Sequence, residues 1–320
     1  MSIPSNNEKS NQNAQPEELE ETAKRKRKLD RSRLAAKAAE GVSPKLGKRI
    51  GNCRSWVTTD VYEHFKTHAK VRKVRETYAC DVTKFCPVCA WDNAQEVSKD
   101  LRGRLAALKK AGDVYVQIFL TLTVKNCALG ELRKTLVAMS VGWRRLMQTK
   151  RWKQAVTGGY FRGTEYIGDK TPKGQAHPHF HAILLMKPTY FTGKTYIKHA
   201  EWVQMWRDAM RLNYDPVVGV QRITERRRKH QDEVAAAVAE VAKYSVTPAT
   251  IERLTSKEFG LLYSQTKGLR QFAYGGLLAE ILPLLDPEEQ FEDSEEWQSL
   301  CTEVWTWGSG QYVLTRRDNK

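Results

Sequence analysis

The sequence predicts an α+β protein. Runs of β-branched and aromatic residues alternate with longer segments in which apolar residues recur at helical spacing. Strands are predicted near residues 114–124, 159–166, 180–186 and 217–223, and helices near residues 92–111, 129–150, 200–212 and 231–244. Two of the strands flank a segment rich in turn formers, which indicates antiparallel pairing.

The composition is that of a globular protein with a polyanionic partner. The chain has 320 residues, enough for one large or two modest domains, and 41% of them are hydrophobic. The formal net charge of +16 indicates a nucleic-acid partner. No apolar run is long enough to cross a membrane, and the N-terminus is too polar for a signal peptide. We therefore expect a cytoplasmic protein with no membrane partner.

Residues 1–45 are expected to form a disordered basic arm, because they contain almost no aliphatic clustering. The cations at positions 24–28 could add phosphate contacts that do not depend on sequence. The alternative is a solvated, charged tail.

A cysteine cluster follows within residues 46–112. Cys86 and Cys89 form a C-x-x-C pair, whose spacing lets both thiolates bind one zinc ion. Cys80 is a good third ligand, and Cys53 is the natural fourth, although His64 or His68 could replace it. A redox role would need a thioredoxin-like βαβ context, which the sequence does not contain. We expect a structural Zn²⁺ that adds stability rather than chemistry.

The strand at 114–124 is expected to have two different faces. Phe119, Thr121 and Thr123 alternate on one side, and aliphatic residues occupy the other. The hydroxyl groups of Thr121 and Thr123 could contact a phosphate. The alternative is an ordinary strand with one polar face.

The stretch from 159 to 186 is predicted to be a hairpin with its turn near Lys173. His177, His179 and His181 alternate, so a strand would project all three to one face. In this register, Glu165 lies opposite the region of His179 and His181. Two imidazoles and a carboxylate would suit Mn²⁺, Mg²⁺, Co²⁺ or Zn²⁺. A histidine-rich loop end without a metal is the alternative, and the alternation with an opposed Glu165 favours the metal site.

Two residues of the helix predicted at 231–244 are candidates for chemistry. Glu240 and Tyr244 are four residues apart, so a helix would place them on one face. In isolation, Tyr244 is typical of a partly buried aromatic residue and Glu240 of a solvated charge. Beside a metal site, both become candidate functional groups. Downstream, Arg270 could contact phosphate, and Gly275-Gly276 suits a turn or a close backbone approach.

Four motifs occur in one order along the chain. They are Phe-Cys-Pro-Val-Cys at 85–89, Phe-Leu-Thr-Leu-Thr at 119–123, His-Pro-His-Phe-His at 177–181 and Glu-Val-Ala-Lys-Tyr at 240–244. The ordered set resembles the HUH endonucleases, and among them the single-tyrosine replication initiators of small Gram-positive-type rolling-circle plasmids. The segment 267–276 is similar to the C-terminal signature of that family. The resemblance covers roughly residues 50–280.

The resemblance implies an HUH-type antiparallel sheet with flanking helices, to which an N-terminal zinc-binding segment is added. It implies that Glu165, His179 and His181 bind a catalytic Mn²⁺ or Mg²⁺. Tyr244 would attack DNA, and Glu240 would help to end the reaction cycle. His177 stays ambiguous, because its parity places it on the same face as the two implied ligands.

The implied activity is metal-dependent nicking of DNA and strand transfer. The expected partners are single-stranded or hairpin-extruded origin DNA and the host helicase and polymerase. Further DNA contacts are expected from Thr121, Thr123, Lys243, Arg226, Arg227 and Arg270.

The expected domain order is a disordered arm at 1–45, a zinc-binding segment and helix at 46–112, a nicking and ligation domain at 113–282, and an acidic, Trp-rich extension at 283–320. Three other functions are consistent with the same motifs. One is an HUH transposase or relaxase, although the single candidate tyrosine and the absence of helicase motifs disfavour a large relaxase. Another is a non-catalytic DNA-binding regulator on the same fold. The third is a zinc-stabilised basic protein that binds nucleic acid without sequence specificity.

Overall fold

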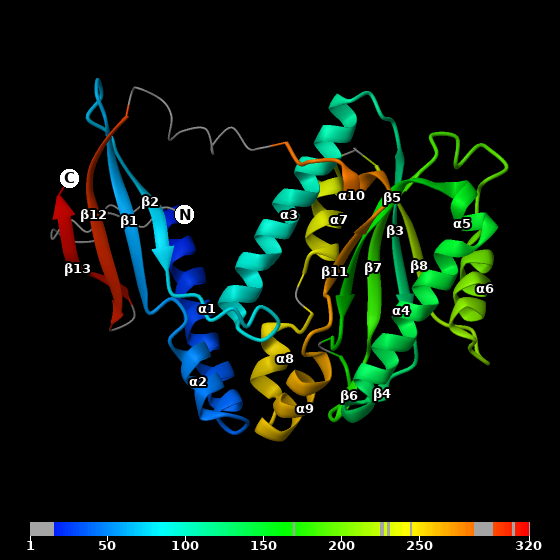
Figure 1. Cartoon of the computed structure of the whole chain (residues 1–320), viewed down its shortest axis with the longest axis horizontal. Coiled ribbons are helices and arrows are strands. Elements are labelled where there is room, and N and C mark those ends of the chain that lie inside the picture. The colour runs from blue at the N-terminus through cyan, green and yellow to red at the C-terminus, as the bar shows by residue number, and fades with distance from the viewer. Residues whose placement is uncertain are drawn as a thin grey trace. The chain divides into compact units, whose positions relative to one another are not determined.

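A computed structural model describes residues 16–168, 170–224, 227–228, 231–243, 245–284, 297–308 and 311–319, with backbone only for 16–27, 227–228 and 231–232. The chain divides into two compact units (Figure 1). The terminal unit comprises Met1–Ala90 and Asp286–Lys320, and the central unit comprises Trp91–Leu285. The division differs from the expected domain order, because the segment after 285 belongs with the N-terminal part.

The central unit is built on a five-stranded sheet with the strand order β11-β5-β7-β3-β8, in which every neighbouring pair is antiparallel. Its strands are β3 (Val116–Thr123), β5 (Val156–Glu165), β7 (His179–Met186), β8 (Val218–Ile223) and β11 (Phe272–Gly275). The four strands predicted from the sequence are confirmed, and the α+β class with them. The short β11 was not predicted.

The central strand of the sheet is β7, and all of its residues are buried. A strand covered on both faces needs apolar side chains in both directions, which the run Ala182–Met186 provides. His179 and His181 lie at the start of this strand and are 8% exposed each. The fold therefore places two imidazoles in the middle of a covered sheet.

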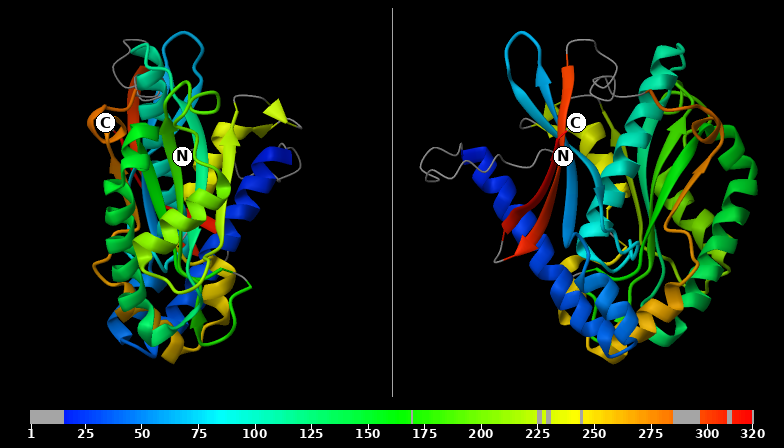
Figure 2. Two further views of the ribbon diagram at one scale, coloured as in Figure 1. Left: turned by 90° about the vertical axis from the view of Figure 1, so that its right-hand side faces the viewer. Right: turned by 60° about the vertical axis from the view of Figure 1, so that its left-hand side comes forward.

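Helices cover both faces of this sheet (Figures 1 and 2). One face packs on α4 (Leu132–Gln148), α5 (Lys150–Ala155) and α6 (His199–Met210), whose tryptophans Trp143, Trp152 and Trp206 join the core. The other face packs on α3 (Pro87–Lys110), α7 (Glu233–Val241) and α10 (Leu277–Glu280). The odd-numbered residues of β3, β5 and β7 point to this second face, as the alternation of Phe119 and Ile118 between the two cores shows.

Short elements connect these layers. They are η1 (Leu129–Glu131), β4 (Cys127–Ala128), β6 (Gln175–Ala176), β9 (Arg227–Arg228), β10 (Gln231–Asp232), α8 (Pro248–Arg253) and α9 (Ser256–Thr266). The start of α8 is capped by Thr247, whose hydroxyl accepts a hydrogen bond from the backbone of Thr250. A capping box between Thr255 and Glu258 begins α9.

The terminal unit contains a four-stranded antiparallel sheet with the strand order β13-β12-β1-β2. Its strands are β1 (Trp56–His64), β2 (Lys70–Thr77), β12 (Trp297–Gly308) and β13 (Gln311–Asn319). The right-hand view of Figure 2 shows this sheet clearly. Buried Trp305 packs with Val57, so part of the Trp-rich C-terminal extension forms core rather than a solvated surface.

Two helices, α1 (Pro16–Glu40) and α2 (Pro44–Gly51), precede this sheet. Disorder was expected for residues 1–45, and the structure differs from Pro16 onward. The segment is rich in Ala, Lys, Arg and Glu, which favour helix even without a clear apolar stripe. Ala35, Ala36 and Ala39 are buried, so the second half of α1 is packed. None of the described helices combines the length and apolar character needed to cross a membrane.

At two glycines near β11 and β5 of the central sheet, another segment of backbone approaches closely. Gly276 has a φ of +68°, and a Cβ atom there would meet the backbone of Gly159. This confirms the close approach expected at Gly275-Gly276. At Gly163 in β5, a Cβ atom would collide with the carbonyl oxygen of Val241, the last residue of α7. Gly163 therefore lets the end of α7 lie directly on the sheet.

We predict that Gly163→Ala lowers the free energy of unfolding by about 1–3 kcal/mol, because the new methyl group must push α7 away. Gly130→Ala is the matched control, since no atom lies within 4 Å of a Cβ built at Gly130. Urea unfolding followed by circular dichroism measures both changes. Equal stability of the two variants would show that the contact with Val241 imposes no constraint.

Candidate metal and nucleic-acid site

The candidate site is formed by two neighbouring sets of paired residues that run across β3, β7 and β5. In one set, Thr123 pairs with His179, which pairs with Glu165. In the next set, Thr121 pairs with His181, which pairs with Gly163. The hairpin register predicted from the sequence is therefore confirmed. Three side chains with metal-binding atoms lie on one face, and the place that a side chain at Gly163 would take beside His181 is occupied by the backbone of Val241.

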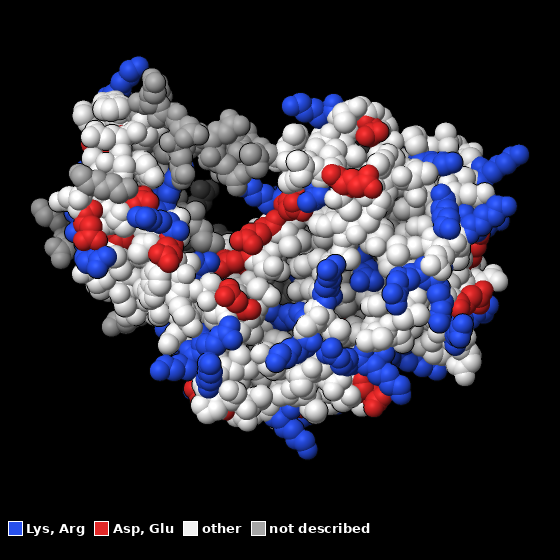
Figure 3. All heavy atoms as spheres, viewed as in Figure 1, with Lys and Arg blue, Asp and Glu red and all other residues white. Residues whose placement is uncertain are grey.

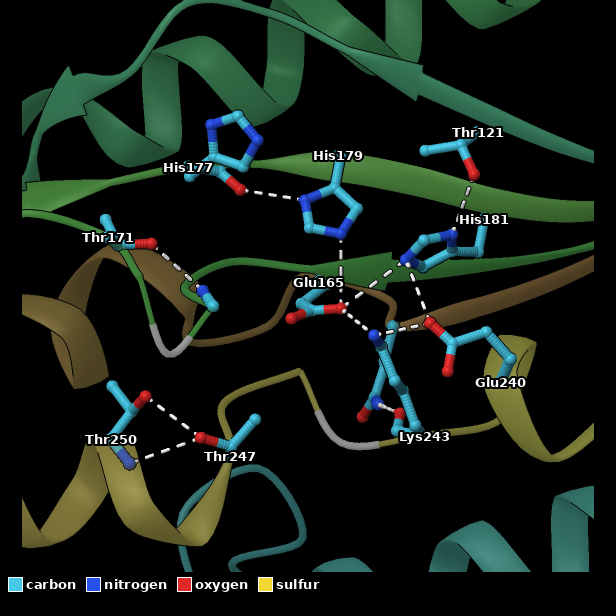
Figure 4. Close-up of polar contacts among 12 residues, drawn as sticks. Thr121, Glu165, Thr171, His177, His179, His181, Glu240, Lys243, Thr247 and Thr250 are labelled. Carbon is cyan, nitrogen blue, oxygen red and sulfur yellow. Dashed lines mark hydrogen bonds and ion pairs between the residues drawn. The ribbon is translucent and has the colours of Figure 1, made fainter. Parts of the chain in front are cut away.

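Both imidazoles converge on one carboxylate oxygen (Figure 4). Oε2 of Glu165 lies 3.1 Å from Nε2 of His179 and 3.4 Å from Nε2 of His181. One ligand atom from each residue lies within 4.8 Å of the others. The Glu165 side chain is only 5% exposed, so its charge has little contact with water. The arrangement can hold a cation.

The second nitrogen of each imidazole is held by a neighbour. Nδ1 of His179 lies 2.9 Å from the carbonyl oxygen of His177 and must carry hydrogen to bond it. Nδ1 of His181 lies 3.2 Å from the hydroxyl group of Thr121. These contacts orient both rings so that Nε2 faces Glu165. Such outer contacts are typical of histidines that bind metals.

The local electrostatics favour an ionised Glu165 and a neutral His181. Burial raises the pKa of Glu165, but its polar contacts with His179 and His181 outweigh burial and hold this pKa well below its ordinary value. Burial lowers the pKa of His181. A carboxylate and a neutral imidazole are the forms that bind divalent metals.

Glu240 near the end of α7 and Lys243 just after it complete the cluster. Nζ of Lys243 lies 2.7 Å from Oε2 of Glu165 and 2.6 Å from Oε1 of Glu240. Oε1 of Glu240 lies 3.7 Å from Nε2 of His181. Burial lowers the pKa of Lys243, but its bonds to Glu165 and Glu240 outweigh burial and raise this pKa. The structure thus brings both Glu240 and Lys243 to the predicted ligands.

Backbone contacts hold this end of α7 in place. The carbonyl oxygen of Val241 lies over Gly163, and the side-chain amide of Gln271 donates a hydrogen bond of 3.1 Å to the carbonyl oxygen of Lys243. Neither Gly163 nor Gln271 was singled out from the sequence. A glycine inside a strand was the available signal for Gly163. Nothing in the sequence indicated Gln271, because it meets Lys243 only through the fold.

His177 lies outside the cluster of ligand atoms. Its Nδ1 lies 2.6 Å from the side-chain oxygen of Asn126. The β7 strand begins at His179, so the strand alternation used to place His177 does not reach it. This geometry separates His177 from the pair formed by His179 and His181.

The other predicted contact residues have different surroundings. Thr123 donates to the carbonyl oxygen of Val217, and Arg270 is exposed in the loop before β11. Tyr244, Arg226 and the side chain of Arg227 lie outside the described residues. The predicted helix ends at Val241 rather than at Tyr244, so helical spacing from Glu240 does not extend that far.

A second cluster in the terminal unit contains the four predicted cysteines Cys53, Cys80, Cys86 and Cys89. All are buried, and their sulfur atoms lie within 4.8 Å of one another. Sγ of Cys89 lies 3.4 Å from that of Cys53 and 3.5 Å from that of Cys80. Hydrogen bonds from Cys53 and Cys80 lower the pKa of Cys86. The structure places Cys53 in this cluster rather than His64 or His68.

Comparison with known proteins gives a consistent result. The Rep_1 family model, described as "Replication protein", matches residues 71–310. A "Protein rep" of Bacillus amyloliquefaciens is 30% identical over 276 residues, which cover 79% of each chain. A "Protein rep" of Lactiplantibacillus plantarum is 33% identical over 216 residues, covering 65% of this chain and 67% of the relative.

A "Replication protein" of Staphylococcus aureus is 34% identical over 218 residues, covering 62% of this chain and 89% of the relative. This chain belongs to the replication-protein family. The resemblance to rolling-circle plasmid initiators is thereby confirmed at the level of the family. No solved structure gives a significant match.

The surface of this replication protein agrees with an anionic partner. Figure 3 shows many Lys and Arg side chains over the part of the central unit where α4 and α9 lie. A narrower band of Asp and Glu follows α3. Positively charged side chains attract the phosphate backbone of a nucleic acid, and the whole chain carries a net charge of +16. The basic surface is therefore the one suited to such a partner.

We propose that the cysteine cluster binds a structural Zn²⁺, for which four thiolates are a closed ligand set. We predict that Cys86→Ala with Cys89→Ala releases about one zinc per chain and lowers the melting temperature, because buried thiolates lose their shared cation. Cys127→Ala is the control, since Cys127 lies outside the cluster. Elemental analysis and thermal unfolding measure the two effects. Unchanged zinc content and melting would contradict the proposal.

Proposed function

We propose that this protein initiates rolling-circle replication of a plasmid by nicking one strand of the origin. The nick would leave a 5′-phosphotyrosine on the protein and a 3′-OH that primes a host polymerase. The substrate would be single-stranded or extruded as a hairpin, because the reacting phosphate must reach a site lined by buried side chains. Membership of the replication-protein family supports the biological role.

One observation carries the chemical part of the proposal: two imidazole nitrogens converge on one oxygen of buried Glu165. Nε2 of His181 is buried and has no hydrogen bond of normal geometry, although Oε2 of Glu165 lies only 3.4 Å away. A buried nitrogen without a good partner costs free energy, and a coordinated cation would remove that cost. The residues therefore fit a metal.

Glu165, His179 and His181 would hold Mn²⁺ or Mg²⁺, with Mn²⁺ better suited to the two nitrogen donors. The bound ion supplies Lewis-acid polarisation of a non-bridging phosphate oxygen. Thr121 would act by holding His181 in its ligating orientation through Nδ1. The direct phosphate contacts expected of Thr121 and Thr123 remain predictions.

Tyr244 would perform the covalent step. Its phenolic oxygen forms a bond to phosphorus, and the bond between phosphorus and the 3′ oxygen breaks. The phenolic proton is lost, and the departing 3′ oxygen takes up a proton, so the step is balanced. An ordinary tyrosine has a pKa near 10, so a cationic neighbourhood would favour the reactive phenolate. Lys243, the preceding residue, supplies one positive charge to this neighbourhood.

Glu240 would serve the step that closes the cycle. A single nucleophilic tyrosine can make one cleavage, and release of the finished strand requires another. The Glu240 side chain is 46% exposed and adjoins His181, so its carboxylate can reach both solvent and the site. We propose that it removes a proton from the water molecule that performs the second cleavage.

The remaining chain would hold DNA and recruit partners. Basic residues such as Arg226, Arg227 and Arg270 are proposed backbone contacts, which position DNA without reading its sequence. Host helicase and polymerase are proposed protein partners. We also propose that the central unit is an HUH-type nicking domain, which the antiparallel sheet and the site on β5 and β7 support.

We predict that the wild-type protein forms a denaturation-resistant adduct with a single-stranded origin oligonucleotide in Mn²⁺, and that Tyr244→Phe forms none. The label belongs on the 3′ side of the nick, which stays attached to the tyrosine. Tyr196→Phe is the control, because Tyr196 is an exposed tyrosine outside the site. An adduct that persists in Tyr244→Phe would exclude Tyr244 as the nucleophile. Binding of the correct origin by wild type without any adduct would favour a non-catalytic regulator.

We predict that Glu240→Gln retains the first nick but releases the covalent adduct at least about tenfold more slowly, the lower range of general-base effects. The amide keeps the size of the carboxylate and cannot take the proton from water. Single-turnover nicking and decay of the adduct are measured separately in a time course. Equal decay in wild type and Glu240→Gln would remove the general-base role and leave the nucleophile assignment intact.

A further inference from the structure

The ammonium group of Lys243 shares an oxygen with the proposed metal ligands. Oε2 of Glu165 is the oxygen nearest to Nε2 of both histidines, and Nζ of Lys243 lies 2.7 Å from the same atom (Figure 4). An ammonium group donates hydrogen bonds and has no lone pair, so it cannot itself be a metal ligand. Lys243 and a divalent cation are therefore both attracted to the negative charge of the same oxygen atom, Oε2 of Glu165.

The two cations should not occupy this oxygen together. A metal coordinated by Oε2 would lie within a few ångströms of Nζ, and two positive charges at that separation repel strongly where water is scarce. Conversely, a buried carboxylate without a nearby cation is costly. Glu165 is 5% exposed, so one cation has to be present, and Lys243 can supply it.

Glu240 provides a second place for the ammonium group. Its Oε1 lies 2.6 Å from Nζ of Lys243, and its side chain is 46% exposed, against 5% for Glu165. Lys243 is itself 31% exposed and has a flexible four-carbon chain. A small movement away from Glu165 would leave the ammonium group paired with Glu240 at the more exposed side of the site.

We propose that Lys243 is a built-in counter-ion that competes with the divalent metal for Glu165 and shifts to Glu240 when the metal binds. The inference rests on the proposed metal site. It makes Lys243 a positioning residue: it keeps the ligand cluster assembled before the metal arrives and sets the metal concentration at which the site fills. The shift would also leave its charge beside Glu240.

The first test is Mn²⁺ affinity, measured by electron paramagnetic resonance of free Mn²⁺ on protein that retains its zinc. Lys243→Met keeps the length of the side chain and removes its charge. We expect it to bind Mn²⁺ about tenfold more tightly than wild type, the factor equivalent to one partly buried ion pair. Lys134→Met is the matched control, since Lys134 pairs with Glu131 at the same i,i+3 spacing but is 86% exposed. Its affinity should equal that of wild type.

The second test separates competition from a general structural role. Without Mn²⁺, Lys243→Met should melt about 2–4 °C below wild type, because Glu165 loses its counter-ion. With saturating Mn²⁺, the two proteins should melt at the same temperature. An equal loss under both conditions would make Lys243 an ordinary structural residue and overturn the inference.

The outcomes distinguish this inference from the proposed function. Equal Mn²⁺ affinity in wild type and Lys243→Met would overturn the role of Lys243 while the metal site stands. Glu165→Gln should abolish the Mn²⁺ binding that is measured. If wild type binds no Mn²⁺, or if Glu165→Gln binds it as well as wild type, the proposed metal site and the competition at it both fail.

Discussion

The antiparallel register between β5 and β7 is the constraint on which the site depends. Pairing Glu165 with His179 places the carboxylate beside the imidazoles, and pairing with β3 places Thr121 beside His181. A slip of one residue would turn Glu165 to the face packed on α4 and α6, where Phe180 and Trp206 lie. Because both faces of β7 are buried, such a slip would also move core side chains from one packed face to the other, where they do not fit. The packing that stabilises the sheet thus fixes the ligand geometry.

Placing ionisable groups in a covered sheet has a cost that the surrounding residues offset. Glu165 loses hydration and regains favourable contacts from two imidazoles and from Lys243. The loss of hydration of His181 is less fully offset, because its Nε2 has no hydrogen bond of normal geometry. An unsatisfied buried polar group of this kind is expected at a functional site rather than where the fold alone is optimised. Stability and the proposed cation binding therefore depend on the same atoms.

Local patterns predicted the hairpin well, because strand alternation, turn formers and one opposed acid specify its register within about twenty residues. The cysteine cluster was also predictable, since the C-x-x-C spacing has few structural uses. The sheet of the terminal unit was not, because β1 pairs with β12 across more than two hundred residues and no local signal encodes that partner. The helix α1 was not predicted, because its many charged residues suggested a disordered tail. In the structure, Ala35 and Ala39 of this helix are buried. His177 was ambiguous because alternation is valid only inside the strand, which begins at His179.

Two backbone contacts at the end of α7 add to the packing of Val238 and Val241 in the core, and this has a chemical consequence. The carbonyl oxygen of Val241 lies over Gly163, and the carbonyl oxygen of Lys243 accepts from Gln271. Anchoring by main-chain atoms leaves the side chains of Glu240 and Lys243 available to contact Glu165 and His181. A strand glycine and a single amide can therefore help to determine how closely a helix end approaches the proposed metal site, although neither residue offers a ligand atom to it.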